Sequence, residues 1–160
     1  MEEAKEILLL YKLKYKELEK LREKIRDIEE SLTPASQIDQ APGRSYASSP
    51  TEKAAVALAD LKNKYIIKSV RTELMRQKIC DLIDEMESTT DREMFFARYM
   101  LLLPWKEVIK RMDIYRPCKK YELKAVNGYK HKEALKKFQT ILNTIPDKRK
   151  EEIYELARNI

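Results

Sequence analysis

Glycine, cysteine and histidine are scarce in this chain of 160 residues, which contains two Gly, two Cys and one His. So little glycine disfavours β-rich folds, which need glycine in their turns, and it disfavours the glycine-rich loops that bind phosphates. The single His131 has no second His and no Cys close in sequence, so a metal site is not expected. The chain also has no recognisable pairing of a nucleophile with a base. We therefore expect a protein that is not an enzyme and that binds neither cofactor nor metal.

Long apolar runs are missing as well. Runs such as residues 99–103 are much too short to cross a bilayer, so no membrane association is expected. The first residues show no basic stretch before an apolar core, so a secretory signal is not expected either. Cys80 and Cys118 are then predicted to be free thiols in a cytoplasmic protein.

The positive charge is confined to one segment. The chain carries 33 basic and 27 acidic residues, a net charge of +6, and residues 105–142 alone carry 11 basic and 4 acidic residues. A concentrated basic patch indicates a polyanionic partner, usually nucleic acid. The alternative is a solvated helix face without a partner.

Residues 1–32 are predicted to form one long helix with a heptad stripe, because apolar residues alternate at spacings of three and four. A helix of this kind must pair with another part of the chain or with a second copy. Only Lys14 interrupts the stripe, which consists of Ala4, Ile7, Tyr11, Lys14, Leu18, Leu21, Ile25, Ile28 and Leu32.

A linker and a second long helix follow. Residues 33–50 hold three of the six prolines and Gly43, and they show no periodicity, so they are predicted to be a flexible linker. A capping box at Ser49–Glu52 then starts a long central helix over residues 51–88. Its predicted buried stripe is Leu58, Leu61, Tyr65, Met75, Ile79, Leu82 and Met86, while Ile66, Ile67, Val70 and Leu74 lie on an adjacent face.

The remaining segments are predicted to be shorter helices. A second capping box, Thr90 to Glu93, indicates a helix over residues 91–102 that Pro104 ends. The next helix, residues 105–112, has Trp105 on its apolar face and precedes a turn over residues 113–117 and a basic stretch over residues 118–142, interrupted at Asn127-Gly128. Residues 146–160 are predicted to form a last amphipathic helix.

A supporting helix, a tight turn and a basic helix are typical of a helix-turn-helix, which residues 89–145 are predicted to form. The predicted fold is therefore all-α, with long, coiled-coil-like N-terminal and central helices and a compact C-terminal helix-turn-helix domain. Most candidate DNA contacts are lysines, which suit phosphates better than bases. Asn127 either reads a base or caps and kinks the helix beside Gly128. The candidates are Lys106, Arg116, Lys119, Lys120, Lys124, Asn127, Lys130, His131 and Lys132.

Residues 48–142 resemble a family of phage transcriptional regulators from Gram-positive hosts, the RinA/ArpU-like late-operon activators. The resemblance is carried by the order and spacing of Arg98-Tyr99, the Leu-Pro-Trp-Lys-Glu-Val-Ile-Lys-Arg-Met run at 103–112, and the His-Lys-Glu-Ala-Leu-Lys-Lys-Phe run at 131–138. It implies a DNA-binding domain similar to region 4 of sigma factors. It also implies gene activation on double-stranded DNA in a bacterial cell, with host RNA polymerase as a second candidate partner. Independently of the resemblance, pairing of the N-terminal stripe with a second copy would give a dimer that presents two reading heads to one operator, so a dimer is the expected assembly.

This chain departs from the family pattern between Met112 and Ala134, where its 22-residue spacing is longer. Either the recognition helix is longer and kinked at Asn127-Gly128, or a loop is inserted. Two alternative functions also remain open. One is a small-terminase-like protein that recognises phage DNA for packaging, and the other is a coiled-coil scaffold that does not bind DNA.

Overall fold

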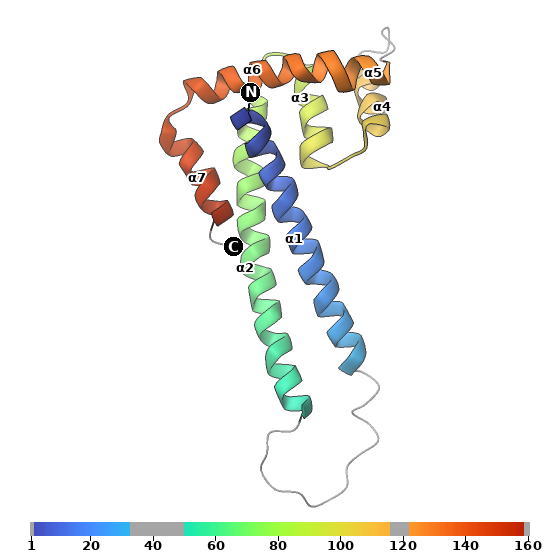
Figure 1. Ribbon diagram of the computed structural model, residues 1–160, viewed down its shortest axis with the longest axis vertical. Coiled ribbons are helices and arrows are strands. Elements are labelled where there is room, and N and C mark those ends of the chain that lie inside the picture. Colours follow the sequence, from blue (N-terminus) through green and yellow to red (C-terminus); the bar gives the residue numbers. More distant parts are fainter. Residues whose placement is uncertain (1, 33–49, 116–121, 159–160) are drawn as a thin grey trace, which may run out of the picture. The chain divides into compact units, whose positions relative to one another are not determined.

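The computed structural model describes residues 2–32, 50–115 and 122–158, and these residues form helices and no strands (Figure 1). The prediction of an all-α fold with a long N-terminal helix is confirmed. Two short segments, labelled η, are π-helices. The elements are α1 (Glu2–Leu32), α2 (Pro50–Asp84), α3 (Thr89–Phe95), η1 (Phe96–Met100), α4 (Trp105–Tyr115), α5 (Leu123–Ala125), η2 (Val126–Lys130), α6 (His131–Thr144) and α7 (Asp147–Arg158).

The chain divides into two units. Unit 1 consists of Met1–Lys14 and Arg71–Ile160, and unit 2 consists of Tyr15–Val70. The first part of α1 and the last part of α2 thus belong to unit 1, together with all the shorter helices. None of the described helices combines the length and the apolar character that a membrane span needs.

Unit 2 contains the rest of α1 and α2. The heptad stripe of α1 is covered within the chain, because Leu18 and Ile25 are buried and Leu21 is half-buried. From α2, the residues of its predicted stripe in this unit, Leu58, Leu61 and Tyr65, are half-buried. An ion pair between Lys62 and Glu29 joins the two helices in this unit. The stripe of α1 is therefore a packing surface inside one chain.

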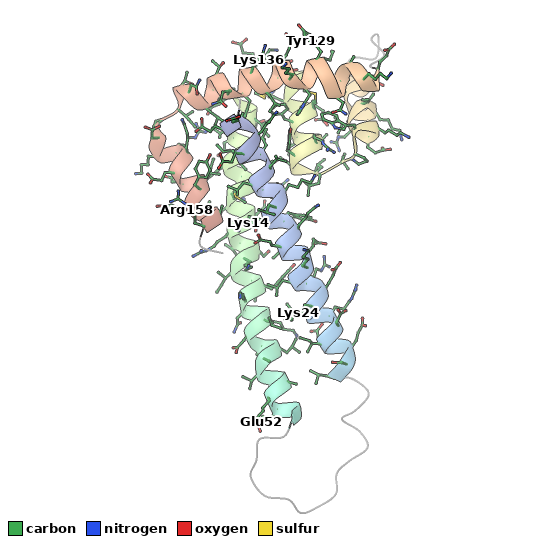
Figure 2. The ribbon with its side chains drawn as sticks, viewed as in Figure 1. Lys14, Lys24, Glu52, Tyr129, Lys136 and Arg158 are labelled. Carbon is green, nitrogen blue, oxygen red and sulfur yellow. The ribbon has the colours of Figure 1, made fainter. Side chains whose placement is uncertain are left out.

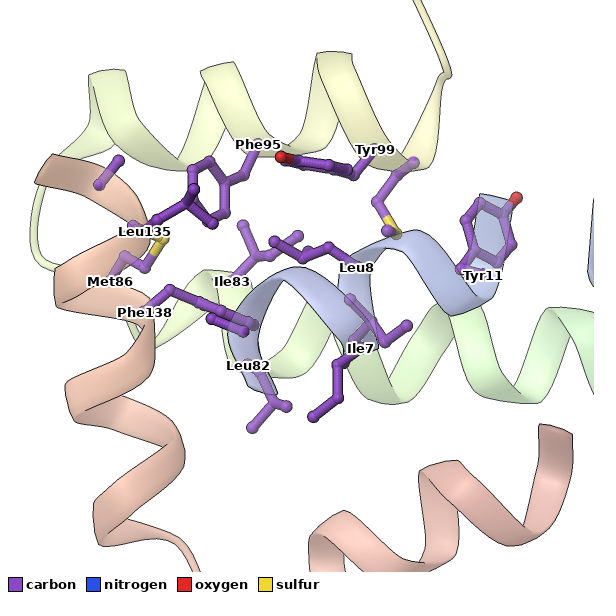
Figure 3. Close-up of a cluster of buried hydrophobic side chains, with 14 of the residues drawn as sticks. Ile7, Leu8, Tyr11, Leu82, Ile83, Met86, Phe95, Tyr99, Leu135 and Phe138 are labelled. Carbon is purple, nitrogen blue, oxygen red and sulfur yellow. The ribbon is translucent and has the colours of Figure 1, made fainter. Parts of the chain in front are cut away.

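Unit 1 encloses a hydrophobic core to which α1, α2, α3, η1 and α6 all contribute (Figure 3). The rings of Phe95 and Phe138 are fully buried and meet edge to face, with their centroids 5.6 Å apart. The core extends to Val108 and Met112 of α4 and to Ile153 of α7. Burial of these large side chains is the main source of stability in such a core.

Two polar contacts connect α6 to the start of α1 inside unit 1. The Gln139 side-chain oxygen accepts a hydrogen bond from the Ala4 amide at 3.1 Å, and its amide nitrogen donates to the Glu3 carboxylate at 3.0 Å. The amides at the start of a helix have no partner within the helix. Gln139 therefore caps α1 from a distant part of the chain.

The start of α3 differs from the prediction. Ser88, and not Thr90, caps the helix, because its hydroxyl accepts a hydrogen bond from the Asp91 amide at 3.2 Å. Thr90 is buried in the first turn, and Glu93 is engaged by Arg111 at 2.6 Å instead of completing a capping box. The hydroxyls of Ser88 and Thr90 both fit the sequence pattern of a helix cap. Because Thr90 is buried in the first turn, Ser88 provides the cap.

The predicted helix over residues 91–102 changes character before its end. After Phe95 it continues as the π-helix η1, and Leu102 then takes a left-handed conformation with φ 56°. This region is costly for a residue with a branched side chain. The Arg98 guanidinium donates to the Leu103 carbonyl at 2.9 Å and helps to hold the turn before Pro104. Helix α4 runs to Tyr115, so the turn predicted to begin at residue 113 is still helical there.

Candidate nucleic-acid interface

A helical segment runs without a break from Leu123 to Thr144, as α5, η2 and α6. The predicted interruption at Asn127-Gly128 is wrong, since these two residues lie in the π-helical turn η2. Between Leu123 and Ala134 the chain is therefore a continuous helical segment and not a loop. The inner face of the segment is buried in unit 1 through Val126, Ala134, Leu135, Phe138 and Leu142.

The outer face of this segment carries a row of exposed lysines. Lys124, Lys132 and Lys136 are exposed, and Asn127 is exposed between the first two. Lys132 and Lys136 are one helical turn apart and share a face. Within the described part of the chain, none of these three lysines forms an ion pair. We call Lys124, Asn127, Lys132 and Lys136 the lysine row.

The neighbours of the lysine row are neutral or already paired. Figure 2 shows Tyr129 and Lys136 on the outer side of the segment. The Tyr129 hydroxyl donates to Glu133 at 2.6 Å, and Lys137 is held by Asp91 at 2.7 Å. Glu133 is the one acidic residue in the sequence from 123 to 144, which contains five lysines. The surface therefore presents positive charge that its own chain does not neutralise.

Helix α4 adds a further exposed cation. Lys106 lies in the first turn of α4 and is exposed, with no ion pair among the described residues. By contrast, Lys110 is held by Glu107 at 2.8 Å and Arg111 by Glu93 at 2.6 Å. Helix α4 packs against α3 and also contacts α5. Lys106 is therefore the predicted contact on α4 that stays available to a ligand.

The other predicted contacts fall into two groups. Arg116, Lys119 and Lys120 lie outside the described residues, as does Cys118. Lys130 is partly buried and takes part in an interaction of its own within the chain. Three members of the lysine row, Lys124, Asn127 and Lys132, were predicted from the sequence as DNA contacts. The fourth, Lys136, was not among the predicted contacts.

His131 occupies a position unlike that of the lysines. Its Nε2 lies 2.6 Å from the Tyr99 hydroxyl, and its ring meets Trp105 edge to face with a centroid distance of 5.0 Å. Burial, followed by the charges of Arg98 and Lys5, lowers the pKa of His131 to about 4. At neutral pH the imidazole is therefore uncharged and packed among aromatic rings.

The aromatic cluster around His131 supports the start of α6. Tyr99 is buried, and burial raises its pKa to about 12, so its hydroxyl stays protonated and available as a donor to His131. The Arg98 guanidinium lies 4.9 Å from the centre of the Trp105 ring, a cation–π contact. Trp105 is partly buried against the core, as its position on the apolar face predicted. The cluster thus connects η1 and α4 to the start of α6, the helix that carries Lys132 and Lys136.

Other candidate chemistry finds little support. Burial raises the pKa of the Cys80 thiol, which keeps it protonated and unreactive. The described residues contain no group of three or more His, Cys, Asp or Glu side chains placed to hold a metal ion. No protein-family model, no curated protein and no solved structure matches the chain. The lysine row is therefore the strongest candidate site among the described residues.

Proposed function

We propose that this protein binds duplex DNA through the lysine row and Lys106 and thereby regulates transcription. The observation that carries the proposal is a helix whose inner face is anchored in the core and whose outer face presents unpaired lysines. A helix of this kind fits the major groove of B-DNA, where its side chains reach phosphates and base edges. Because the helix is fixed before binding, little ordering is needed when DNA arrives.

The composition of the row sets the expected mode of binding. Lysine is a point charge that suits phosphates, whereas a base edge is read best by a side chain with paired donors and acceptors. Asn127 is the one amide in the row. Affinity should therefore come mainly from phosphate contacts, and sequence preference from a few positions such as Asn127.

The regulatory role rests on the resemblance between residues 48–142 and the RinA/ArpU-like late-operon activators. In this proposal the protein activates phage or prophage genes, with double-stranded DNA and host RNA polymerase as its partners. Selection of bound fragments from phage and host genomes tests it directly. Enrichment of promoter regions supports the proposal, enrichment of a packaging site favours a small-terminase-like role, and no enrichment favours a scaffold.

Salt dependence and a charge variant test the surface itself. Binding to duplex DNA should weaken steeply with salt, because each phosphate that a lysine neutralises releases counterions. Replacing Lys124, Lys132 and Lys136 by Gln should lower affinity for all duplexes and flatten the slope of log affinity against log salt by about 0.9 per lost contact. Replacing the exposed Lys16, Lys20 and Lys24 of α1 by Gln removes the same charge from unit 2 and serves as the matched control.

The outcomes of this comparison are distinct. If both triple variants lose affinity equally, net charge alone drives binding and the lysine row is not the site. If neither variant changes the salt slope, the protein binds DNA elsewhere or not at all. Fluorescence anisotropy with a labelled duplex measures both quantities.

Asn127 separates base reading from backbone contact. The side chain is exposed and lies within a helical segment, so Asn127→Ala should leave the thermal unfolding temperature nearly unchanged. If Asn127 reads a base, the variant should lose about 1–3 kcal/mol of binding free energy on the selected site and none on random DNA. An equal loss on both kinds of DNA would identify Asn127 as a backbone contact.

A further inference from the structure

Unit 2 carries a second heptad stripe, which is exposed among the described residues. On α2, residues 56, 59, 63, 66 and 70 alternate at spacings of three and four, and all five are exposed. Val56, Ile66 and Val70 are 59%, 58% and 55% exposed, which is high for such apolar side chains. We call this set the α2 seam: Val56, Ala59, Asn63, Ile66 and Val70.

The α2 seam is separate from the surface that α2 uses within the chain. In a heptad with Val56, Asn63 and Val70 at the a positions, the half-buried Leu58, Leu61 and Tyr65 fall at positions c and f. These positions lie outside the a/d seam of a coiled coil. Helix α2 therefore has two apolar faces, and its partner within the chain covers only one of them.

We infer that two copies of this chain associate through the α2 seam as a parallel, in-register pair of helices. β-Branched residues at the a positions favour two-stranded parallel coiled coils when Leu occupies d. Val56 and Val70 occupy two of the three a positions here, and Ala59 and Ile66 occupy the d positions. A single Asn at an a position is the common device that fixes partner number and register. Asn63 stands at the central a position, between the two valines.

The parallel orientation of the two helices follows from the hydrogen bonding that a buried Asn63 amide requires. In a parallel pair, a positions face a positions, so the two Asn63 amides meet and hydrogen-bond to each other. In an antiparallel pair, a positions face d positions, and Asn63 would be buried against Ala59 or Ile66. A buried amide without a partner is costly. The parallel arrangement is thus the one that satisfies the polar residue in the seam.

Charge on the flanks agrees with this register. In a parallel pair, each g position faces the e position of the following heptad in the other helix. Ala55 then faces Asp60 of the second copy, and Lys62 faces Ile67 of the second copy. No like charges oppose each other at these e and g positions, and Ile67, which is 58% exposed in the single chain, lies beside Lys62, whose amine is paired with Glu29 of its own chain. Glu52 and Glu73, at the next d positions, mark the two ends of the seam.

The available area suits a weak, reversible contact. The seam and Ile67 together expose on the order of 500 Å² per copy, so a pair that covered all of it would bury at most about 1,000 Å², the lower limit of a specific interface. Helix α2 is already ordered by its packing within the chain, so association need not meet the cost of forming it. We therefore expect a dimer that dissociates on dilution. This inference does not depend on DNA binding.

Sedimentation of the full-length protein without DNA tests the interface. The parent should change from two chains to one as it is diluted, whereas Ile66→Glu with Val70→Glu should sediment as one chain at every concentration. The matched control is Leu9→Glu with Leu13→Glu on α1, because these leucines are 50% and 54% exposed but lie outside the seam. Circular dichroism confirms that each variant stays helical.

Three results would overturn the inference. They are a parent that is a single chain at all concentrations, a seam variant that still dimerises while remaining helical, and a control variant that dissociates as fully as the seam variant.

Asn63 and a cysteine probe test the register. Asn63→Val should tighten association and produce a mixture of larger assemblies, because the residue that fixes partner number is gone. In a background with Cys80 and Cys118 replaced by Ala, Val56→Cys should form a disulfide between two copies on mild oxidation. Crosslinking only when Val56→Cys and Ile66→Cys chains are mixed would indicate antiparallel helices and overturn the parallel pair.

Discussion

The two units of this molecule bury their apolar side chains to different extents. Unit 1 draws on α1, α2 and every shorter helix, and side chains such as Phe95, Phe138 and Leu142 are completely buried. Unit 2 has parts of two helices, and there Ile66, Ile67 and Val70 remain more than half exposed. Two helices cover only one face of each other, so a two-helix unit keeps an apolar face for another partner.

The units also differ in charge. Residues 15–70 carry 10 basic and 9 acidic residues, so the positive excess of the chain belongs almost entirely to unit 1. A nearly neutral surface favours contact between identical copies, because two such surfaces carry little net charge and repel each other only weakly. The proposed DNA surface and the proposed contact between copies therefore use separate parts of the chain.

Truncating one core side chain in each unit should lower the free energy of unfolding by different amounts. Phe138→Ala in unit 1 should lose about 3–5 kcal/mol of the free energy of unfolding, because it leaves a cavity in a closed core. Ile25→Ala in unit 2, where the residue is 9% exposed, should lose about 2 kcal/mol, since the open site can collapse. Urea unfolding followed by circular dichroism measures both losses. Equal losses would mean that the two units are equally closed.

Acid should weaken unit 1 through His131. Its pKa is about 4 when folded and near 6.5 when unfolded, so between these values the unfolded chain binds more protons. Stability should therefore be highest above pH 6.5 and fall as the pH drops toward 4, by about 1–2 kcal/mol after allowance for solvent screening.

His131→Gln provides the control for this pH dependence, because carboxylates also titrate in part of the same range. The difference in unfolding free energy between parent and variant should shrink as the pH falls from 7 toward 4. A difference that stays constant would show that His131 does not titrate with folding.

The sequence predicted the long helices well because their periodicity is local. Every apolar position of the α1 stripe within the described residues is buried or half-buried, and Ile66 and Val70 were correctly separated from the buried face of α2. Local rules failed where a tertiary contact decides between close alternatives. Burial of Thr90 moved the cap to Ser88, and the core contact of Val126 kept the Asn127-Gly128 region helical.

The candidate site was only partly predictable. The exposed Lys124 and Lys132 follow from the concentration of charge in the sequence, and Lys136 follows from them by one helical turn. The position of His131 does not follow, because its neighbours Tyr99 and Trp105 are distant in sequence. A lone histidine among lysines resembles a DNA contact until the aromatic residues that bury it are known.

Gly128 gives a smaller test, with the opposite sign. A Cβ added at Gly128 would meet no atom within 4 Å, and the residue lies in the helical turn η2. Gly128→Ala should therefore stabilise unit 1 by about 0.5–1 kcal/mol, because it restricts the unfolded chain without a clash. A rise in the thermal unfolding temperature supports the continuous helix. A lower thermal unfolding temperature would indicate that η2 requires the conformational freedom of a glycine backbone.

The last contrast concerns two ion pairs, one in each unit, and the pair in unit 2 gives the smallest expected effect. In unit 2, Lys62 and Glu29 have side chains that are 49% and 46% exposed, so Glu29→Gln should cost at most about 0.5 kcal/mol. In unit 1, Arg111 donates to Glu93, whose side chain is only 12% exposed, and Glu93→Gln should cost about 1–2 kcal/mol. The first difference should vanish in high salt, because water and ions already screen an exposed pair, whereas the second should persist. Urea unfolding of each variant and the parent at low and at high salt measures the loss of unfolding free energy for both variants under both conditions. If Glu29→Gln costs as much as Glu93→Gln at both salt concentrations, the helices of unit 2 are as closed to solvent as the core of unit 1, and the contrast between the units is wrong.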